Sequence, residues 1–519
     1  MAIRRTRRGR MAVALVAGLA IAALSACTTS AQNQSTSTAS DTLTIAIPPG
    51  INSLALPTNC SSPLFSLTYA SLINVTADGS YGPGLAESWS YANNNTEFTL
   101  KMRTGLKFAD GTELNAQSVV DTLKYFQTTP GLNQGYLKPF TSITASDAST
   151  VVIKYAEPFI GMETLLANDG ECNNGMMISK AGLAEPAKMG TATFGAGPYT
   201  LDAANTVSGD HYTLVPNPNY YDTASQHWKK VVLRVFSNAT TALDAVKSGQ
   251  IQVSTVNDGT LVPAAEAAGV DVADGQRLGA GLMIWDRDGT LTPALKNEKV
   301  RQAMQYAIDR PNLAKVLGPR YKAFDQFVPD GYTGYDESLV GKYPYDPAKA
   351  KALLAEGGFP SGFKLTVATD AADAGAANMA QAVAQQWKAV GIDTTITPIT
   401  AGSYFTEVGQ KKYSVGAVSY ALLGDVYFDA VRLTKDPYAD VWNPFHPQDS
   451  EVDAAYDKLA RASETDLPAL SVEFNKLITQ KAWFVPVAEA PATLYSKGVE
   501  VGKSALLGQF DYISWKATS

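Results

Sequence analysis

The side chains best suited to catalysis or metal binding are few in this sequence and lie far apart. Its 519 residues include only three histidines, His211, His227 and His446. No HExxH, CxxC, P-loop or GxSxG pattern occurs, so no local stretch supplies metal ligands, a phosphate cradle or an activated nucleophile. Residues distant in sequence could still assemble such a site. The sequence therefore favours a protein that is not an enzyme and holds no metal and no cofactor.

The N-terminus has the composition of an export signal. Five arginines between residues 4 and 10 precede an apolar run at residues 11–23, which is too short to span a bilayer. The tetrapeptide LSAC follows, ends at Cys27, and looks like a bacterial lipobox. We expect residues 1–26 to be removed and a lipid on Cys27 to anchor the protein to the outer side of the bacterial cell membrane. The alternative is a plain secretory signal in which Cys27 has no role.

The number of the remaining cysteines is consistent with an exported protein. Cys60 and Cys172 remain as an even pair in an oxidising compartment. A disulfide between them would close a loop of roughly 100 residues, worth about 4–5 kcal/mol on the loop-entropy model. We favour this bridge, and the alternative is two separate buried thiols.

Length and charge restrict the class of protein. A chain of 519 residues is too long for one hydrophobic core and should divide into two or more domains. Removing residues 1–26 takes away five arginines and no acidic residue, which changes the net charge from −7 to −12. No basic stripe occurs in the rest of the chain, so we expect no nucleic-acid partner. Residues 28–40 lack large apolar side chains, so residues 27–40 predict a flexible tether.

Hydrophobic periodicity predicts an alternation of strands and helices. Apolar residues alternate over Phe98–Met102 as in a half-buried strand, and from Asn115 they recur at helical spacing. Residues 231–254 and 364–399 each show strand, helix and strand, which implies parallel βαβ units with right-handed crossovers. The Gly-rich run at residues 273–281 between them predicts a hinge or a domain boundary.

Three more stretches predict helices. Residues 64–75 look helical, and residues 297–311 place a clean apolar stripe on one helix face. Arg301 and Asp309 fall off that stripe and are expected to be ion-pair partners. Residues 345–359 carry an N-terminal Asp-Pro pair and a C-terminal Gly-Gly pair, which predict where this helix begins and ends.

Five stretches resemble the signature blocks of the family 5 extracellular solute-binding proteins, the peptide- and nickel-type receptors of ABC importers. They follow the same order and extend over nearly the whole chain after residue 26. The first is GLAESWSYANNNTEFTLKMRTGLKFADGTELNAQSVVDTLKY at residues 84–125. The others are FGAGPYTL at 194–201, LVPNPNYYD at 214–222, NEKVRQAMQYAIDRP at 297–311 and YDPAKAKALLAEGGF at 345–359.

The resemblance implies an α/β, two-lobed periplasmic-binding-protein-like fold of class II, whose lobes close on a ligand by bending at a hinge. Lobe 1 would comprise residues 41–276, with an extra α+β subdomain at about residues 74–190. Lobe 2 would comprise residues 277–487, and residues 488–519 would return to lobe 1.

The ligand of such a protein is expected between the lobes, where closure buries most of its surface. In peptide-binding relatives a segment after a strand carries Trp-Gly-x-Asp, whose carboxylate holds the α-ammonium group of the peptide. YALLGDVYFD at residues 420–429 resembles that segment, so it implies Asp425 as the anchor and Asp429 as the reserve. A solvated loop acid is the alternative reading of Asp425. The other expected ligand-binding residues are Trp285, Tyr420, Trp442, Phe194 and Asn59.

The sequence thus predicts a monomeric, lipid-anchored receptor that captures a peptide or a similar small solute outside the cell and delivers it to an ABC permease. For Trp285, which ends the strand-like run LMIW, a packed core is the alternative to a cleft wall. One alternative function keeps the fold and changes the solute to a metal chelate, an opine or an oligosaccharide. A secreted hydrolase and a sensor subunit for a membrane kinase are alternatives of other classes.

Overall fold

The computed structural model describes most of the chain after residue 40. The predictions for residues 1–40, Asn59, Cys60, Cys172 and Asp425 therefore lie outside the described residues. The described residues are 41–49, 55–56, 63–76, 80–129, 132–168, 173–256, 258–371, 373–400, 403–421, 426–431, 442–502 and 510–518.

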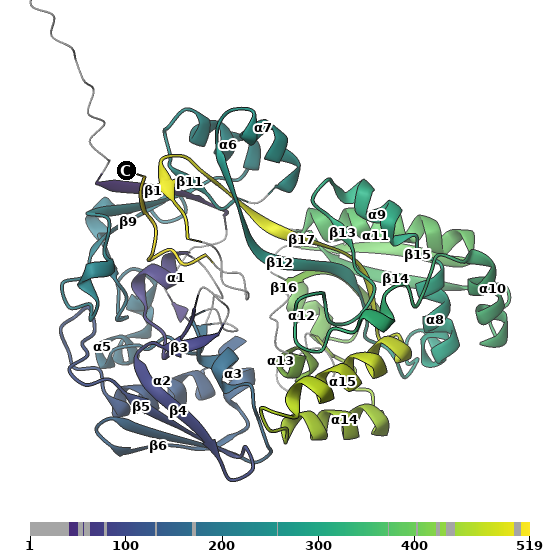
Figure 1. Cartoon of the computed structure of the whole chain (residues 1–519), viewed down its shortest axis with the longest axis horizontal. Coiled ribbons are helices and arrows are strands. Elements are labelled where there is room, and N and C mark those ends of the chain that lie inside the picture. The colour runs from purple at the N-terminus through teal and green to yellow at the C-terminus, as the bar shows by residue number, and fades with distance from the viewer. Residues whose placement is uncertain are drawn as a thin grey trace, which may run out of the picture. The chain divides into compact units, whose positions relative to one another are not determined.

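A mixed sheet of 11 strands forms the framework of the fold (Figure 1). The strand order is β15-β14-β16-β12-β17-β11-β1-β10-β9-β8, and β13 also pairs with β17. The strands are β1 (Thr42–Ile47), β8 (Tyr199–Leu201), β9 (His211–Pro216), β10 (Lys230–Val235), β11 (Val253–Ser254), β12 (Asp271–Ile284), β13 (Lys322–Ala323), β14 (Phe363–Asp370), β15 (Ile392–Ile399), β16 (Val415–Ala421) and β17 (Phe484–Ser496).

The N-terminal half of this sheet consists of β8, β9, β10, β1 and β11. Strands β10 and β11 flank helix α6 (Ala239–Lys247) in the chain, as the sequence predicts for a βαβ unit. They run in the same direction, but β1 lies between them and pairs in parallel with both. Apolar side chains of β1 are fully buried, because helices and loops cover both faces of this half.

The C-terminal half consists of β15, β14 and β16. Strand β14, helix α11 (Ala374–Ala389) and β15 form the second predicted βαβ unit, and here the two strands are direct parallel neighbours. Strand β16 pairs in parallel with the other side of β14. Helix α11 packs its Met379, Val383 and Trp387 side chains onto this half, where all three are fully buried.

Two long antiparallel strands, β12 and β17, join the halves (Figure 1). Strand β12 contains the Gly-rich run at residues 273–281, so this run is extended chain rather than a loop. Its glycines allow close packing: a Cβ atom on Gly281 would lie 2.4 Å from the Phe484 ring. The pairing shifts register between Asp274 and Arg277 and again between Ala280 and Gly281. That this crossing is the hinge between two lobes stays a prediction.

A separate four-stranded antiparallel sheet, in the order β4-β5-β7-β6, carries the first family-like stretch. Its strands are β4 (Ala86–Ala92), β5 (Glu97–Met102), β6 (Phe140–Asp147) and β7 (Thr150–Tyr155). The buried side chains Phe98, Leu100 and Met102 alternate along β5 as predicted. Helix α2 (Ala116–Thr128) begins at Asn115, whose side chain accepts hydrogen bonds from two backbone N–H groups of its first turn. The buried side chains of α2 and of this sheet pack together in one hydrophobic core.

The stretch at residues 194–201 crosses the chain closely, as its glycines predict. A Cβ atom on Gly197 would lie 2.4 Å from the carbonyl carbon of Thr68, and the Gly197 N–H donates to the Thr68 carbonyl. Helix α1 (Pro63–Thr68) ends at this contact, so the helix predicted for residues 64–75 is too long. Beyond it, the backbone of Leu72 pairs with Gly175, and the chain continues as strand β2 (Ile73–Val75), which pairs with β3 (Tyr81–Pro83).

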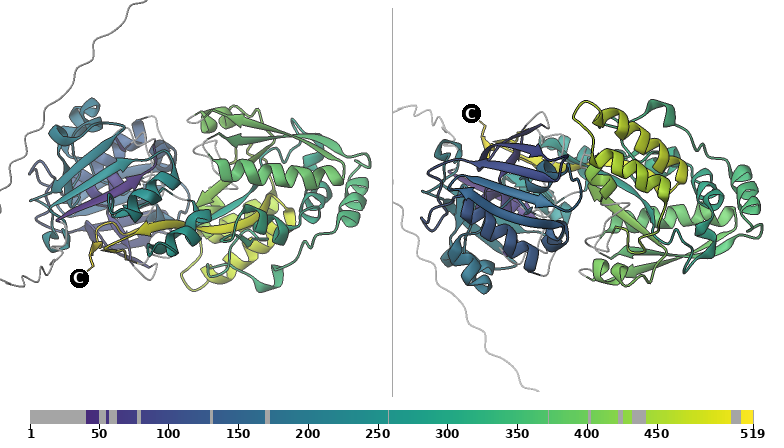
Figure 2. Two further views of the ribbon diagram at one scale, coloured as in Figure 1. Left: turned by 90° about the horizontal axis from the view of Figure 1, so that it is seen from above. Right: turned by 90° about the horizontal axis from the view of Figure 1, so that it is seen from below.

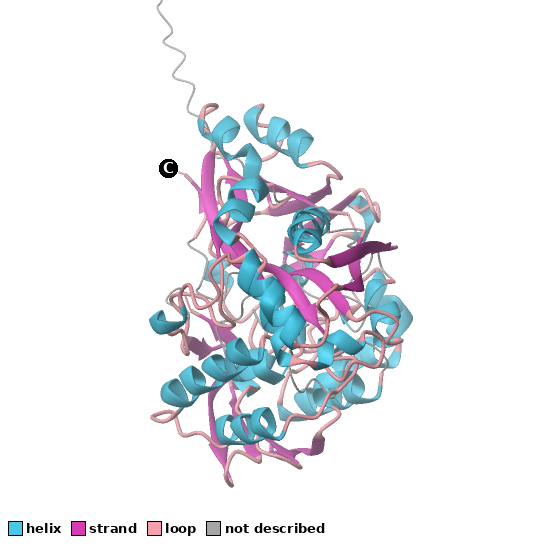
Figure 3. Ribbon diagram, turned by 90° about the vertical axis from the view of Figure 1, so that its right-hand side faces the viewer, coloured by secondary structure: helices cyan, strands magenta, loops and turns pink. Residues whose placement is uncertain are grey.

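Helices and strands are mixed along the described chain, and helices lie on both sides of the main sheet (Figure 3). The pair α14 and α15 lies side by side in Figures 1 and 2. The mixed α/β fold class predicted from the sequence is confirmed. The remaining helices are α3 (Leu132–Leu137), α4 (Met162–Leu166), α5 (Lys180–Ala184), α7 (Val262–Glu266), α8 (Glu298–Tyr306), α9 (Arg310–Leu317), α10 (Pro347–Glu356), α12 (Tyr404–Gly409), α13 (Val426–Ala430), α14 (Ser450–Ala460) and α15 (Leu467–Lys481). Short strands β18 (Val499–Glu500) and β19 (Lys516–Ala517) pair near the C-terminus.

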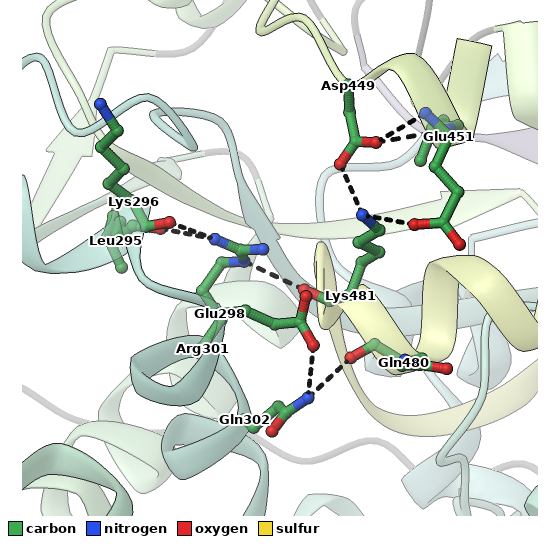
Figure 4. A network of polar contacts seen from close by, with 10 residues as sticks. Leu295, Lys296, Glu298, Arg301, Gln302, Asp449, Glu451, Gln480 and Lys481 are labelled. Atoms are coloured by element: carbon green, nitrogen blue, oxygen red, sulfur yellow. Dashed lines mark hydrogen bonds and ion pairs between the residues drawn. The ribbon is translucent and has the colours of Figure 1, made fainter. Parts of the chain in front are cut away.

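A polar network fixes α8 against the end of α15 (Figure 4). The buried guanidinium of Arg301 donates to the carbonyl oxygens of Lys481 at 3.0 Å and Leu295 at 2.8 Å. Asp309 accepts from the backbone N–H of Asn312 and caps α9. The predicted pairing of Arg301 with Asp309 is therefore wrong, because each side chain satisfies main-chain groups at a helix end instead.

The Lys481 ammonium lies between two carboxylates, 2.9 Å from Asp449 and 2.9 Å from Glu451 (Figure 4). Burial alone would raise the pKa of Asp449, but hydrogen bonds from Lys481 and from backbone N–H groups outweigh it and lower that pKa. Burial alone would lower the pKa of Lys481, but the two carboxylates outweigh it and raise that pKa. Both shifts favour the charged pair in the folded state.

We expect Lys481→Met to lower the free energy of unfolding by about 1–2 kcal/mol at pH 7. The difference from wild type should persist over the neutral range. It should shrink in acid as Asp449 is protonated through its lowered folded pKa, and in strong base as Lys481 deprotonates through its raised folded pKa. Denaturant unfolding at pH 7 and pH 3 measures this. Lys299→Met, which removes an exposed pair with Glu356, is the matched control and should cost less than about 0.5 kcal/mol.

Candidate functional site

The carboxyl ends of β14 and β16 lie side by side, because the two strands are parallel neighbours. After β14 the chain turns into α11 and continues to β15, whereas after β16 it leads to α13 on the other side of the sheet. The two connections therefore diverge between these strands. Such a switch point leaves a crevice outside the carboxyl ends, which is where open α/β sheets bind ligands.

Asp373 defines one wall of this crevice. One of its carboxylate oxygens accepts from the Ala376 N–H at 2.9 Å and so caps α11. The other accepts from the Ser419 N–H of β16 at 3.0 Å. The carboxylate thus fixes the start of α11 to the end of β16, and it keeps a negative charge at the edge of the sheet.

A cavity of about 570 Å³ lies at this edge, a volume suited to a small organic ligand. Both halves of the sheet and both crossing strands contribute to its wall. The N-terminal half supplies the turn Asp258–Thr260, which follows β11. The wall residues used below are Asp258, Thr260, Arg320, Tyr321, Asp373 and Ser419.

The charge of the cavity wall is negative. Asp258, from the N-terminal half, accepts from the N–H and hydroxyl of Thr260 at 3.0 and 2.6 Å. Arg320 forms an ion pair with Asp274 of β12, so its charge is already neutralised. The Asp258 and Asp373 carboxylates therefore set the sign of the field inside the cavity.

Burial and the negative charges at this edge of the sheet raise the pKa values of two tyrosine hydroxyls. Burial raises the pKa of the Tyr321 hydroxyl, and the charges of Asp373 and Asp258 raise it further. Burial likewise raises the pKa of Tyr404, and Asp370 at the end of β14 and Asp373 add to it. Both phenols therefore stay protonated at neutral pH. The edge of the sheet offers carboxylates that attract a cation, with neutral hydroxyls beside them.

Three of the aromatic residues predicted from the sequence belong to one hydrophobic cluster. Tyr420 lies at the end of β16, where its ring packs edge-on against Phe484 at 5.3 Å. Trp442 is half-buried at the margin of the cluster. Trp285 is only 1% exposed, and a Cβ atom on Gly416 would lie 2.0 Å from its ring. Tyr420 thus follows Ser419 of the crevice wall in β16, but its ring is buried in this cluster, and its role in ligand binding stays a prediction. Trp285 lies in the packed interior, the second of its two expected settings.

The other predicted residues lie elsewhere. Asp429 is half-buried on α13, a short helix whose Phe428 packs into the core of the four-stranded sheet and stacks on Tyr136 at 5.6 Å. Phe194 packs over Gly182 at the margin of that same core, away from the other aromatic candidates. Asp425 and Asn59 lie outside the described residues. A ligand role for each of these residues stays a prediction.

Sequence reasoning missed Asp258, Asp373 and Arg320. Asp373 had a usable signal, since an acidic residue just before a helical pattern marks a cap at the end of a predicted strand. The turn at Asp258 follows a two-residue strand, and Arg320 follows a helix end, so neither had a periodic pattern around it. Only the fold brings the three together.

The family profile of the bacterial extracellular solute-binding proteins, family 5 (middle), matches residues 80–442. The chain belongs to this family. It is thus the solute-binding component of an ABC importer, in agreement with a ligand crevice built from two halves of a sheet. No helix within the described ranges is long and apolar enough to cross a membrane.

Individual relatives agree with this assignment. The glutathione-binding protein GsiB of Escherichia coli K12 is 28% identical over 434 residues, which cover 80% of this chain and 82% of that protein. The fold is similar to that of AgaA from A. tumefaciens R10, solved with agropinic acid (TM-score 0.78, 21% identity, 92% of this chain and 99% of that chain). It is also similar to DppA from Helicobacter pylori, solved with the peptide STSA (TM-score 0.77, 18% identity, 92% and 98%). These matches are to transport proteins rather than enzymes.

Proposed function

We propose that this family 5 protein captures a peptide, or a similar solute with a free amino group, in the crevice at the carboxyl ends of β14 and β16. The observation that carries the proposal is the cavity wall, in which each half of the sheet contributes one carboxylate, Asp258 and Asp373. An ammonium group between them would form charge-assisted hydrogen bonds in a partly desolvated place. Bending at β12 and β17 would then move the two carboxylates relative to each other and close the crevice on the solute.

The remaining parts of the proposal follow from the sequence. The protein would be a monomer anchored outside the cell by a lipid on Cys27, and it would pass an unmodified solute to its permease. Glutathione-binding and peptide-binding relatives support a solute with an α-ammonium group. AgaA, solved with agropinic acid, supports an opine as the second candidate solute.

Neutralising the carboxylates tests the site. We expect Asp258→Asn and Asp373→Asn each to weaken binding of a free peptide by about 10- to 100-fold, the value of a hydrogen bond to a charged group. Asparagine at position 258 keeps the one oxygen that accepts both bonds from Thr260. Asparagine at position 373 keeps an acceptor for only one of two backbone N–H groups, so denaturant unfolding of Asp373→Asn accompanies its binding measurement. Asp393→Asn, an exposed substitution on β15, is the control and should have no effect. Calorimetry with a panel of tetrapeptides measures the affinities.

The same panel in N-acetylated form completes the experiment, because acetylation removes the positive charge. The proposal predicts that acetylation weakens binding to wild type and adds little to the loss in either variant. Equal binding of free and acetylated peptides to wild type would contradict the role of the carboxylates.

A further inference from the structure

A second cavity of about 540 Å³ lies beside the crossing strand β17, where β13 pairs with it. Its wall consists of residues 308–309 before α9, residues 310–311 at the start of α9, parts of residues 323–335 and 340–345, and Glu489 of β17. None of these residues belongs to the wall of the crevice cavity. The proposed function therefore leaves this cavity unexplained.

Four carboxylates line this second cavity: Asp309, Asp325, Asp330 and Glu489. Two of them hold local backbone groups. Asp309 caps α9, and Asp325 accepts from the Gly341 N–H at 2.6 Å. Such bonds orient the carboxylates but leave their negative charge in place.

Glu489 is the most informative of the four. It is only 9% exposed, and one carboxylate oxygen pairs with the Arg277 guanidinium of β12. The other oxygen, Oε2, is buried and has no hydrogen-bond partner among the described residues. A buried charged oxygen without a partner costs free energy unless something pairs with it. The Oε2 atom of Glu489 is therefore a hydrogen-bond acceptor in the cavity wall that has no donor among the described residues.

The cationic groups of the protein do not neutralise the cavity. Arg310 is the basic residue of its described wall, but its guanidinium is buried and donates to the Pro486 carbonyl at 2.8 Å and to Gln305. Arg277 divides its donors between Glu489 and the carbonyl of Asp330. The guanidiniums of Arg310 and Arg277 therefore stand against four carboxylates, which leaves a net negative charge at the cavity.

The rim of the cavity is apolar. Val340 and Tyr345 are 52% and 49% exposed, and they are two of the few large hydrophobic side chains that the described surface leaves open. Pro311, Pro329 and Pro344 add rigid apolar surface beside them. Carboxylates beside exposed apolar side chains fit a ligand with a positive head and a short hydrocarbon body.

A metal ion is a poor fit. Within the described part of the chain no group of three or more His, Cys, Asp or Glu side chains is close enough to share an ion. We infer that this cavity is a second ligand site, which takes an organic cation: a primary ammonium group on a short alkyl chain. The ammonium would donate to Glu489 and Asp330 while the alkyl chain lies against Val340 and Tyr345.

Titration calorimetry with 1-aminohexane and with its neutral analogue 1-hexanol tests this site. We expect the amine to bind at least tenfold more tightly than the alcohol, and added salt to weaken only the amine. Asp330→Asn should weaken the amine about two- to fivefold, as for an exposed charge pair, and Glu489→Gln by more. Asp330 is exposed, so its variant should fold even where Glu489→Gln does not.

The crevice variants Asp258→Asn and Asp373→Asn separate this site from the proposed peptide site. They should leave unchanged the amine-binding event that Asp330→Asn weakens, which is separate from any binding of the amine in the crevice, and Ca²⁺ should neither bind nor compete. Equal affinity for amine and alcohol, loss of amine binding in the crevice variants, or competition by Ca²⁺ would each overturn the inference. Failure of the peptide experiment alone would not affect it.

Discussion

Replacing Asp286 by alanine should lower the free energy of unfolding by about 3–5 kcal/mol, the cost of breaking a buried charged network. This carboxylate is 0% exposed and follows the end of β12. One oxygen accepts from the Thr290 N–H at 2.7 Å, and the other accepts from the N–H groups of Leu291 and Thr292, each at 2.7 Å. Alanine would leave three N–H groups without their acceptor in a place that excludes water.

Asp288 offers a matched control two residues away. It is exposed, so Asp288→Ala should change the stability by less than about 0.5 kcal/mol. Denaturant unfolding of both variants and of wild type under one set of conditions makes the comparison. Similar stabilities for Asp286→Ala and Asp288→Ala would show that the turn at residues 286–292 does not depend on this carboxylate.

Removing the Trp285 ring should have an effect of similar size. Trp285→Ala is expected to cost about 3–5 kcal/mol, because a fully packed indole leaves a cavity that the surrounding chain fills only in part. The ring lies against Gly416 of β16, so neither strand can move in without distorting the sheet. Trp285→Phe should lose less, because a smaller aromatic ring fills part of the same space.

This pair of variants also decides between the two settings expected for Trp285. If the indole belongs only to the core, Trp285→Phe should lower stability and leave the affinity for solute within about twofold. A tenfold loss of affinity without loss of stability would establish Trp285 as a wall of the ligand site instead.

Much of the fold was predictable because its signals are local. The alternation in β5, the change to helical spacing at Asn115 and the βαβ unit of β14, α11 and β15 each depend on contiguous residues, and each is confirmed. The insertion of β1 between β10 and β11 was not predictable, since pairing between residues 188 and 208 positions apart leaves no local pattern. Likewise, the Gly-rich run that predicts a hinge or a domain boundary is part of strand β12, where Gly281 packs closely against Phe484, and the hinge itself stays a prediction.

The site was predictable only in outline. Tyr420 was expected as a ligand-binding residue, and the structure places it near the carboxyl end of β16, where its ligand role stays a prediction. The pairing of Asp258 with Asp373 across a cavity had no sequence signal, because those residues are more than a hundred positions apart and the fold alone brings them together. The burial of Asp286 was not predictable for another reason: in the sequence, a buried acid that accepts from backbone N–H groups looks like any acidic residue of a loop.

The most direct test of the central claim is hydrogen exchange measured by mass spectrometry, with and without a peptide that binds. The account predicts slowed exchange at residues 258–261, 370–378 and 417–421, with the peptide recovered at its original mass. Protection confined to other parts of the chain, or recovery of a cleaved peptide, would contradict it.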